Sequence, residues 1–143
     1  MHKRKFIVSS FYKFVYLSDS EKKKEILKRK FLDLDIKGTF ILGEEGINGS
    51  FSVKSDEFEM VKRLLDKLIT SDINFKTQCS SSHSFLRLKV KLKKEIVTMG
   101  EKNVYPKVTS GKYLNPDSWD DLLNKDDSII IDTRNSYESE VGT

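Results

Sequence analysis

The stretch TFILGEEGINGSFSV (residues 39–53) determines how the rest of this chain is arranged. Its first part, TFILG (39–43), predicts a short buried strand, and FSV (51–53) predicts the strand that returns beside it. Between them, EEGINGS (44–50) supplies two glycines and an Asn48–Gly49 pair, the residue types of a tight chain reversal. The middle of the chain is therefore predicted to be a β-hairpin.

A helix is predicted on each side of this hairpin. The first follows a Ser18–Glu21 capping box and ends near Leu34, and its outer surface carries the basic run KKKEILKRK. The second covers about 56–69 and places its apolar residues on one side. Both helices are thus expected to bury one stripe against a sheet.

Outer strands are predicted at 6–17, 73–78 and 85–97, with a polar loop at 78–84. The resulting order is β-α-β-β-α-β with an extra strand before the last. This order is typical of the ferredoxin-like split βαβ arrangement. We therefore predict an α+β fold, an antiparallel sheet with two helices on one face and the other face free.

The segment LRLKVKLK (86–93) alternates strictly between apolar and basic residues. In a strand this pattern predicts one row under the helices, made of Leu86, Leu88, Val90 and Leu92. It predicts a second row on the free face, made of Arg87, Lys89, Lys91 and Lys93. Spaced by roughly 6.5 to 7 Å, these cations could follow the phosphates of RNA, although an ordinary solvated face carries similar lysines.

Aromatic residues of the first strand are expected near that row. Phe11, Tyr12 and Phe14 are candidates for stacking on RNA bases, and Lys13 is a further candidate for contact with phosphate.

Charge is divided unevenly along the 143 residues, whose net charge is +4. Residues 113–143 hold 2 basic and 8 acidic side chains, so residues 1–112 hold 24 basic and 14 acidic ones. A basic body with an acidic tail indicates two units, and the basic unit suits a polyanion such as RNA. A generally lysine-rich composition would produce the same imbalance.

Other candidate sites are less specific. Glu44, Glu45 and Asn48 could orient a ligand or a neighbouring domain from an accessible loop. Cys79 and His83 lack the further ligands or the third group that a metal or catalytic site requires, so no metal is predicted. Acylphosphatase activity is not expected, because no Gly-rich, Arg-bearing loop follows the first strand.

The acidic part predicts the beginning of another domain. After a ferredoxin-like domain at 1–97 and a linker at 98–112, Asn115 and Pro116 begin a helix, and IIID (129–132) predicts a strand buried on both faces. Asp132, Arg134 and Glu138 follow, and Arg134 with Glu138 could form a fixed pair that is structural rather than catalytic. One helix and one strand cannot bury a core alone.

Several motifs together resemble the rhodanese-containing tRNA uridine hydroxylases. They are SFYKFVYL (10–17), GEEGINGS (43–50), FLRLKVKLKKEIVTMG (85–100), GKYLNPDSW (111–119) and IIIDTRNSYESEVGT (129–143). The likeness covers nearly the whole chain. It implies an acylphosphatase-like domain at 1–97 followed, at 113–143, by the start of a rhodanese domain.

That resemblance implies cytoplasmic tRNA modification, in which oxygen is the co-substrate and the wobble uridine becomes 5-hydroxyuridine. The family's catalytic Cys lies beyond these residues, and Cys79 is in the wrong domain to replace it. We therefore expect no catalytic residue and no hydroxylase activity in this chain alone, and we predict no cofactor. tRNA is the expected partner, with no membrane association, and the unfinished C-terminal strand is expected to allow self-association. The alternative is a standalone RNA-binding or protein-interaction module without catalysis.

Overall fold

The computed structural model describes residues 5–98, 100 and 111–142. The chain divides into two compact units, Met1–Thr109 and Ser110–Thr143. The elements of the first unit are β1 (Phe6–Phe14), α1 (Ser20–Asp33), β2 (Lys37–Gly43), β3 (Gly46–Lys54), α2 (Phe58–Leu68), β4 (Lys76–Ser80) and β5 (Leu88–Leu92). Those of the second unit are α3 (Pro116–Leu123) and α4 (Ser136–Ser139).

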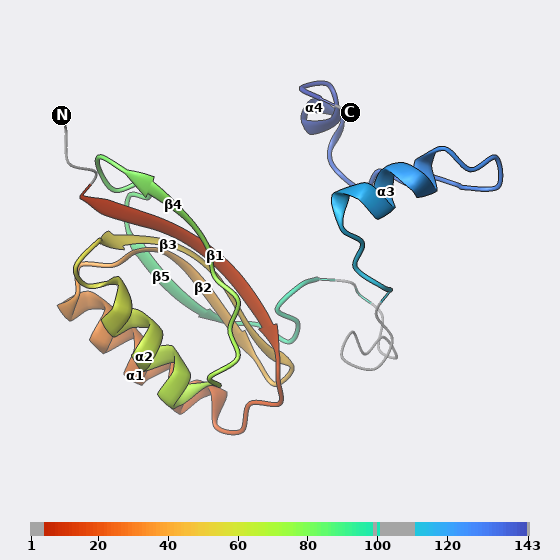
Figure 1. The fold of residues 1–143 in the computed structure, drawn as a ribbon. Coiled ribbons are helices and arrows are strands. Elements are labelled where there is room, and N and C mark those ends of the chain that lie inside the picture. The colour runs from red at the N-terminus through yellow and green to blue at the C-terminus, as the bar shows by residue number, and fades with distance from the viewer. Residues whose placement is uncertain (1–4, 99, 101–110, 143) are drawn as a thin grey trace. The chain divides into compact units, whose positions relative to one another are not determined.

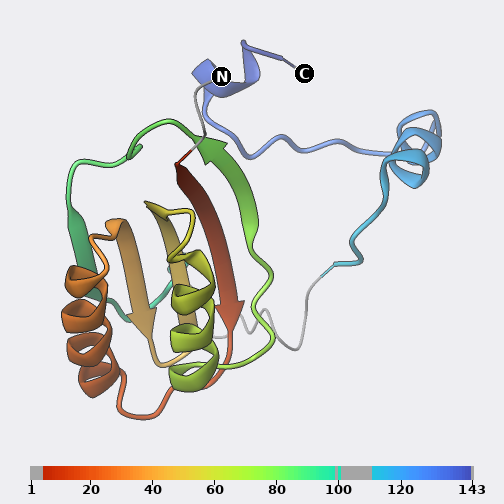
Figure 2. The ribbon, with the colours of Figure 1, turned by 60° about the vertical axis from the view of Figure 1, so that its left-hand side comes forward.

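Five strands form one sheet in the order β4-β1-β3-β2-β5. β1 pairs antiparallel with β3 and β4, β2 pairs antiparallel with β3, and β5 pairs parallel with β2. Both α1 and α2 lie on one side of this sheet (Figures 1 and 2). We call the opposite side the helix-free face. The predicted α+β architecture is confirmed, but the prediction of a purely antiparallel sheet is wrong for β5.

The two strands after α2 exchange the places that the sequence predicted for them. β4 takes the position beside β1, and β5 is the additional strand, at the far edge beside β2. β5 is also shorter than the predicted 85–97. Backbone hydrogen bonds from Gly38 N to Arg87 O (3.1 Å) and from Lys93 N to Leu42 O (2.9 Å) lie at the two ends of its pairing with β2. Leu86, predicted to lie under the helices, is outside the strand and 97% exposed.

The central hairpin turns more tightly than predicted. Gly43 pairs with Gly46, so the loop consists of Glu44 and Glu45 alone. Gly46 has φ +148°, and a Cβ there would lie 2.0 Å from the Lys13 carbonyl oxygen, so only glycine fits. Asn48 and Gly49, predicted to be in the reversal, are therefore interior residues of β3.

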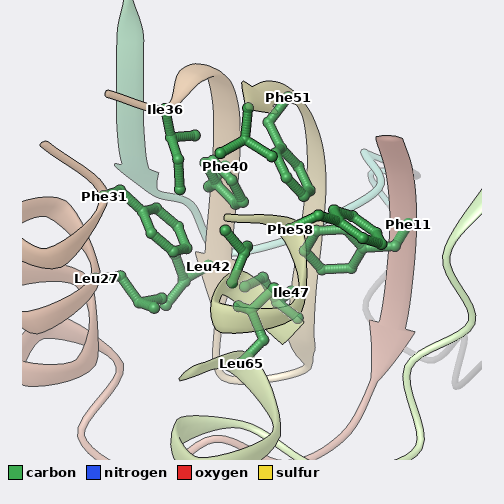
Figure 3. Close-up of a cluster of buried hydrophobic side chains, with 12 residues drawn as sticks. Phe11, Leu27, Phe31, Ile36, Phe40, Leu42, Ile47, Phe51, Phe58 and Leu65 are labelled. Atoms are coloured by element: carbon green, nitrogen blue, oxygen red, sulfur yellow. The ribbon is translucent and has the colours of Figure 1, made fainter. Parts of the chain in front are cut away.

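Phenylalanine side chains form the centre of the core between the sheet and the helices (Figure 3). The ring of Phe40 lies 4.5 Å from that of Phe31 and 5.2 Å from that of Phe51, measured between centroids. Phe11 and Phe40 come from strands on opposite sides of β3, and their rings approach across Gly49. A Cβ on Gly49 would lie 2.7 Å from Phe11 Cε1 and 2.9 Å from Phe40 Cδ1. Gly49 is therefore a packing requirement and not a turn residue.

The start of α1 also differs from its prediction. The residue before the helix is Asp19, whose φ of 55° is left-handed, and no side chain caps the helix there. Lys23 Nζ instead donates a hydrogen bond of 2.6 Å to the Ser18 carbonyl oxygen. The predicted Ser18–Glu21 capping box is therefore wrong, because the left-handed Asp19 turns the chain before Ser18 can serve as the cap.

In the second unit, α3 begins as predicted. Asn115 precedes it, and its side-chain oxygen accepts a hydrogen bond of 2.7 Å from Ser118 N. The strand predicted at 129–132 does not form: Ile129, Ile130 and Ile131 are exposed, and the described part of the second unit contains helices α3 and α4 but no strand. Of the predicted linker 98–112, residues 99 and 101–110 lie outside the described residues.

Replacing Gly49 with valine is expected to destabilise the first unit by about 1–3 kcal/mol, because the added atoms must displace Phe11 and Phe40. Urea unfolding followed by circular dichroism measures the change. Ser50→Val, on the next residue but on the helix-free face, serves as the control and is expected to unfold close to the unchanged chain. Equal stability of the two variants would contradict the role assigned to Gly49.

Candidate nucleic-acid interface

Lysines are the charged residues that the strands place on the helix-free face. Phe11, Phe40 and Phe51 point into the core, so their neighbours along each strand point the other way. This alternation assigns five lysines to the helix-free face: Lys37, Lys54, Lys76, Lys89 and Lys91. No Asp or Glu belongs to the strand residues of this face. None of the five lysines forms an ion pair within the described part of the chain.

Two members of the predicted basic row lie on this face within β5. Lys89 and Lys91 are exposed, while Leu88 and Val90 pack against the core. The other two, Arg87 and Lys93, are exposed and lie directly outside the two ends of β5. Leu92 is 37% exposed, so this side chain is less buried than the alternation predicted.

The candidates from β1 separate onto two sides. Tyr12 belongs to the helix-free face, is 48% exposed and has its ring 6.0 Å from that of Phe14. Lys13 points to the opposite side and is paired with Asp72. Phe11 is buried in the core, at 4% exposure. The expectation that Phe11 lies near the basic row is therefore wrong, because adjacent strand residues point to opposite faces. Lys13 lies on the side opposite the basic row.

Glu45 and Asn48 bind the main chain that follows β5. Ile96 N donates to Glu45 Oε1 (2.5 Å), and Asn48 Nδ2 donates to Ile96 O (3.1 Å). The Ile96 side chain is 2% exposed, and its Cγ2 lies 3.5 Å from the position that a Cβ on Gly43 would take. These residues orient a segment of this chain. Glu44 is exposed instead and lines a surface hollow with Glu21 and Glu25, which does not suit an anion.

His83 joins two parts of the chain that lie far from it in the sequence. Its Nδ1 lies 2.9 Å from Ser52 Oγ and its Nε2 lies 3.4 Å from Asp35 Oδ2. Its ring is also 4.5 Å from that of Phe6. The set has the residue types of a hydrolytic triad, but Ser52 is completely buried and its Oγ cannot reach a substrate. The arrangement therefore fixes the loop after β4 to the sheet.

In the second unit, Arg134 pairs with Asp132 and not with Glu138. Arg134 Nε and Nη2 donate to the Asp132 carboxylate at 3.0 and 2.7 Å. These bonds, and a further one from Arg134 N, hold the pKa of Asp132 below its usual value. The Glu138 carboxylate accepts from Asn135 N and Nδ2. The predicted Arg134–Glu138 pair is wrong because Glu138 is used to cap α4.

Sequence reasoning missed Lys37, Lys54 and Lys76, because strand register was needed to place them on one face. Within the described residues, no group of three His, Cys, Asp or Glu side chains is arranged to hold a metal ion. No described helix is long and apolar enough to cross a membrane.

Comparison with known families supplies a context for this surface. Residues 6–96 match the family described as the UPF0176 acylphosphatase-like domain. The chain belongs to this family. The UPF0176 domain thus begins at β1 and ends at Ile96, the residue bound by Glu45 and Asn48.

Curated relatives extend the similarity over almost the whole chain. A protein of Legionella pneumophila (strain Corby) named tRNA uridine(34) hydroxylase is 41% identical over 138 residues, which are 96% of this chain and 54% of the relative. One of the same name from Rickettsia bellii (strain RML369-C) is 42% identical over 144 residues, covering 97% of this chain and 56% of the relative. The chain therefore spans about half the length of the curated relatives it matches.

A solved structure shows a similar fold at low sequence identity. The BLUF protein BlrB, in its dark state, superposes with a TM-score of 0.52 at 15% identity, covering 64% of this chain and 76% of that protein. This likeness concerns the fold of the UPF0176 domain alone.

Removing both side chains that bind Ile96, by Glu45→Ala with Asn48→Ala, is expected to release the Ile96 amide. Its hydrogen-exchange protection should fall by about tenfold or more, because each lost hydrogen bond contributes about 1 kcal/mol. Glu44→Ala is the control, since its exposed carboxylate makes neither bond. Unchanged protection in the double variant would show that the buried Ile96 side chain alone holds the segment.

The pair of Lys13 and Asp72 has a predicted pH signature. The hydrogen bond and then the charge of Lys13 hold the pKa of Asp72 below its usual value of 3.8. The pair therefore stabilises the folded chain fully at pH values above the usual pKa of Asp72. This stabilisation is lost as the pH falls through the lowered pKa that Asp72 has in the folded chain. In an NMR titration, Lys13→Gln should return the Asp72 pKa towards 3.8, whereas Lys62→Gln, on α2, should leave it unchanged.

Proposed function

We propose that the UPF0176 domain binds RNA on its helix-free face and positions tRNA for a hydroxylation at uridine 34. The observation that supports this proposal best is the set of five lysines on a face whose strands carry no acidic residue. The name shared by the relatives supplies the RNA class and the modified position.

Phosphate binding at such a face follows from elementary electrostatics. Exposed lysines that contact phosphates release condensed counterions, and the gain in entropy favours the complex. Tyr12 adds an aromatic surface beside the lysines for contact with a base. A face of this kind orients RNA without itself reacting with it.

The proposed reaction belongs to the whole protein. It is an oxygen-dependent hydroxylation that converts the wobble uridine to 5-hydroxyuridine in the cytoplasm. We assign no catalytic residue to this chain, and its part in the reaction is to hold the RNA.

Lys89→Gln with Lys91→Gln is expected to weaken tRNA binding by the 143-residue chain. The two lost phosphate contacts should reduce the slope of log affinity against log salt by about 1 per contact. Filter binding at several salt concentrations measures both quantities. The matched control is Lys28→Gln with Lys30→Gln, which removes the same charge from the exposed surface of α1, on the other side of the sheet.

A stronger effect from the α1 variant would place the RNA on the helices and contradict the proposal. Absence of salt-dependent tRNA binding by the unchanged chain would also contradict it, and would favour a module that contacts protein.

A further inference from the structure

The strand register places five polar residues in one line across the helix-free face. Lys76 pairs with Ser10, Ser10 with Ser50, Ser50 with Thr39, and Thr39 with Lys89. Directly paired residues of neighbouring strands share a face. The cross-strand row therefore consists of a lysine at each edge of the sheet and three hydroxyl side chains between them.

Two anchored segments lie on either side of this row. On β3, Ser52 is two residues from Ser50 in one direction, and its hydroxyl is bonded to His83. Asn48 is two residues away in the other direction, and its amide is bonded to Ile96. Both Ser52 and Asn48 belong to the helix-free face by alternation. The middle of the helix-free face is therefore bounded along the strand direction by these two segments, but across the strands it continues to both edges of the sheet.

We infer that a single-stranded RNA segment crosses the sheet along the cross-strand row, from Lys76 on β4 to Lys89 on β5. This inference rests on the proposed RNA-binding function. It specifies the direction of the bound RNA, which runs across the strands and not along β5. Lysines at the two ends bind phosphates, and the hydroxyls of Ser10, Ser50 and Thr39 exchange hydrogen bonds with phosphate oxygens and ribose hydroxyls.

The length and the side chains of the cross-strand row favour single-stranded RNA over a duplex. Four gaps between neighbouring strands give the row a length of about 19 Å, which accommodates roughly four extended nucleotides, the lower end of known site sizes for single strands. Small hydroxyl side chains let the RNA backbone approach the sheet closely. Tyr12 flanks the row on one side, and its exposed ring offers an aromatic surface to a base. A duplex would meet the segments held by His83 and Ile96.

Lys76 distinguishes the two directions, because it lies at the edge opposite β5. The experiment measures binding of a fluorescent uridine pentaribonucleotide to the full chain by anisotropy at several salt concentrations. Lys76→Gln and Lys89→Gln are each expected to weaken binding about 3- to 10-fold and to reduce the salt slope by about 0.7. Ser50→Asp, which places a carboxylate in the middle of the row, should weaken it by at least as much.

Lys28→Gln on α1 is the matched control and should bind like the unchanged chain. Each variant's thermal unfolding midpoint verifies that the fold is retained. If Lys76→Gln binds normally while Lys89→Gln is weakened, the RNA runs along β5, and the inference is overturned while the proposed function stands. A five-base-pair RNA duplex that binds as tightly as the single strand would also overturn it. If the unchanged chain binds neither the pentanucleotide nor tRNA, the proposed function fails as well.

Discussion

The close approach of Phe11 and Phe40 across Gly49 is the constraint on which the rest of the first unit depends. A side chain on Gly49 would collide with the rings of Phe11 and Phe40, so the packing of these three strands requires glycine at this position of β3. Because alternate residues face opposite sides, the same alignment also decides which polar residues line the helix-free face. The aromatic core and the lysine-rich surface are thus two results of one register.

Much of this fold follows from local patterns in the sequence. The helical stripes, the central hairpin and the alternation that exposes Lys89 and Lys91 are periodic signals, and the structure contains all three. The predictions failed where the same residue types are compatible with two different local structures. The Asn48–Gly49 pair has the composition of a turn, but tertiary packing places it within a strand. The run Ile129–Ile131 has the composition of a buried strand, but a strand also requires partners for its backbone.

The candidate RNA-binding surface also shows that local sequence patterns predict only part of the structure. Alternation along one strand identified Lys89 and Lys91, yet Lys76 lies at the opposite edge and has no sequence relation to them. Only the pairing of β4 with β1 and of β5 with β2 puts these lysines on one row. The contacts of His83 with Ser52 and Asp35 span 31 and 48 residues, so no local pattern could reveal them. The two adjacent glutamates were similarly ambiguous, since Glu45 binds the chain's own backbone while its neighbour Glu44 is exposed.

The parallel pairing of β5 with β2 has a consequence for how the chain is made. β2 is synthesised about fifty residues before β5, and it must keep an unpaired edge until β5 and the Ile96 anchor have left the ribosome. The exposed edge of a nascent sheet can pair with other chains, so the protein carries an additional aggregation risk during this interval. Pairing of β5 with β2 covers this edge and ends the interval, and the binding of Ile96 by Glu45 and Asn48 then holds the chain that leaves β5.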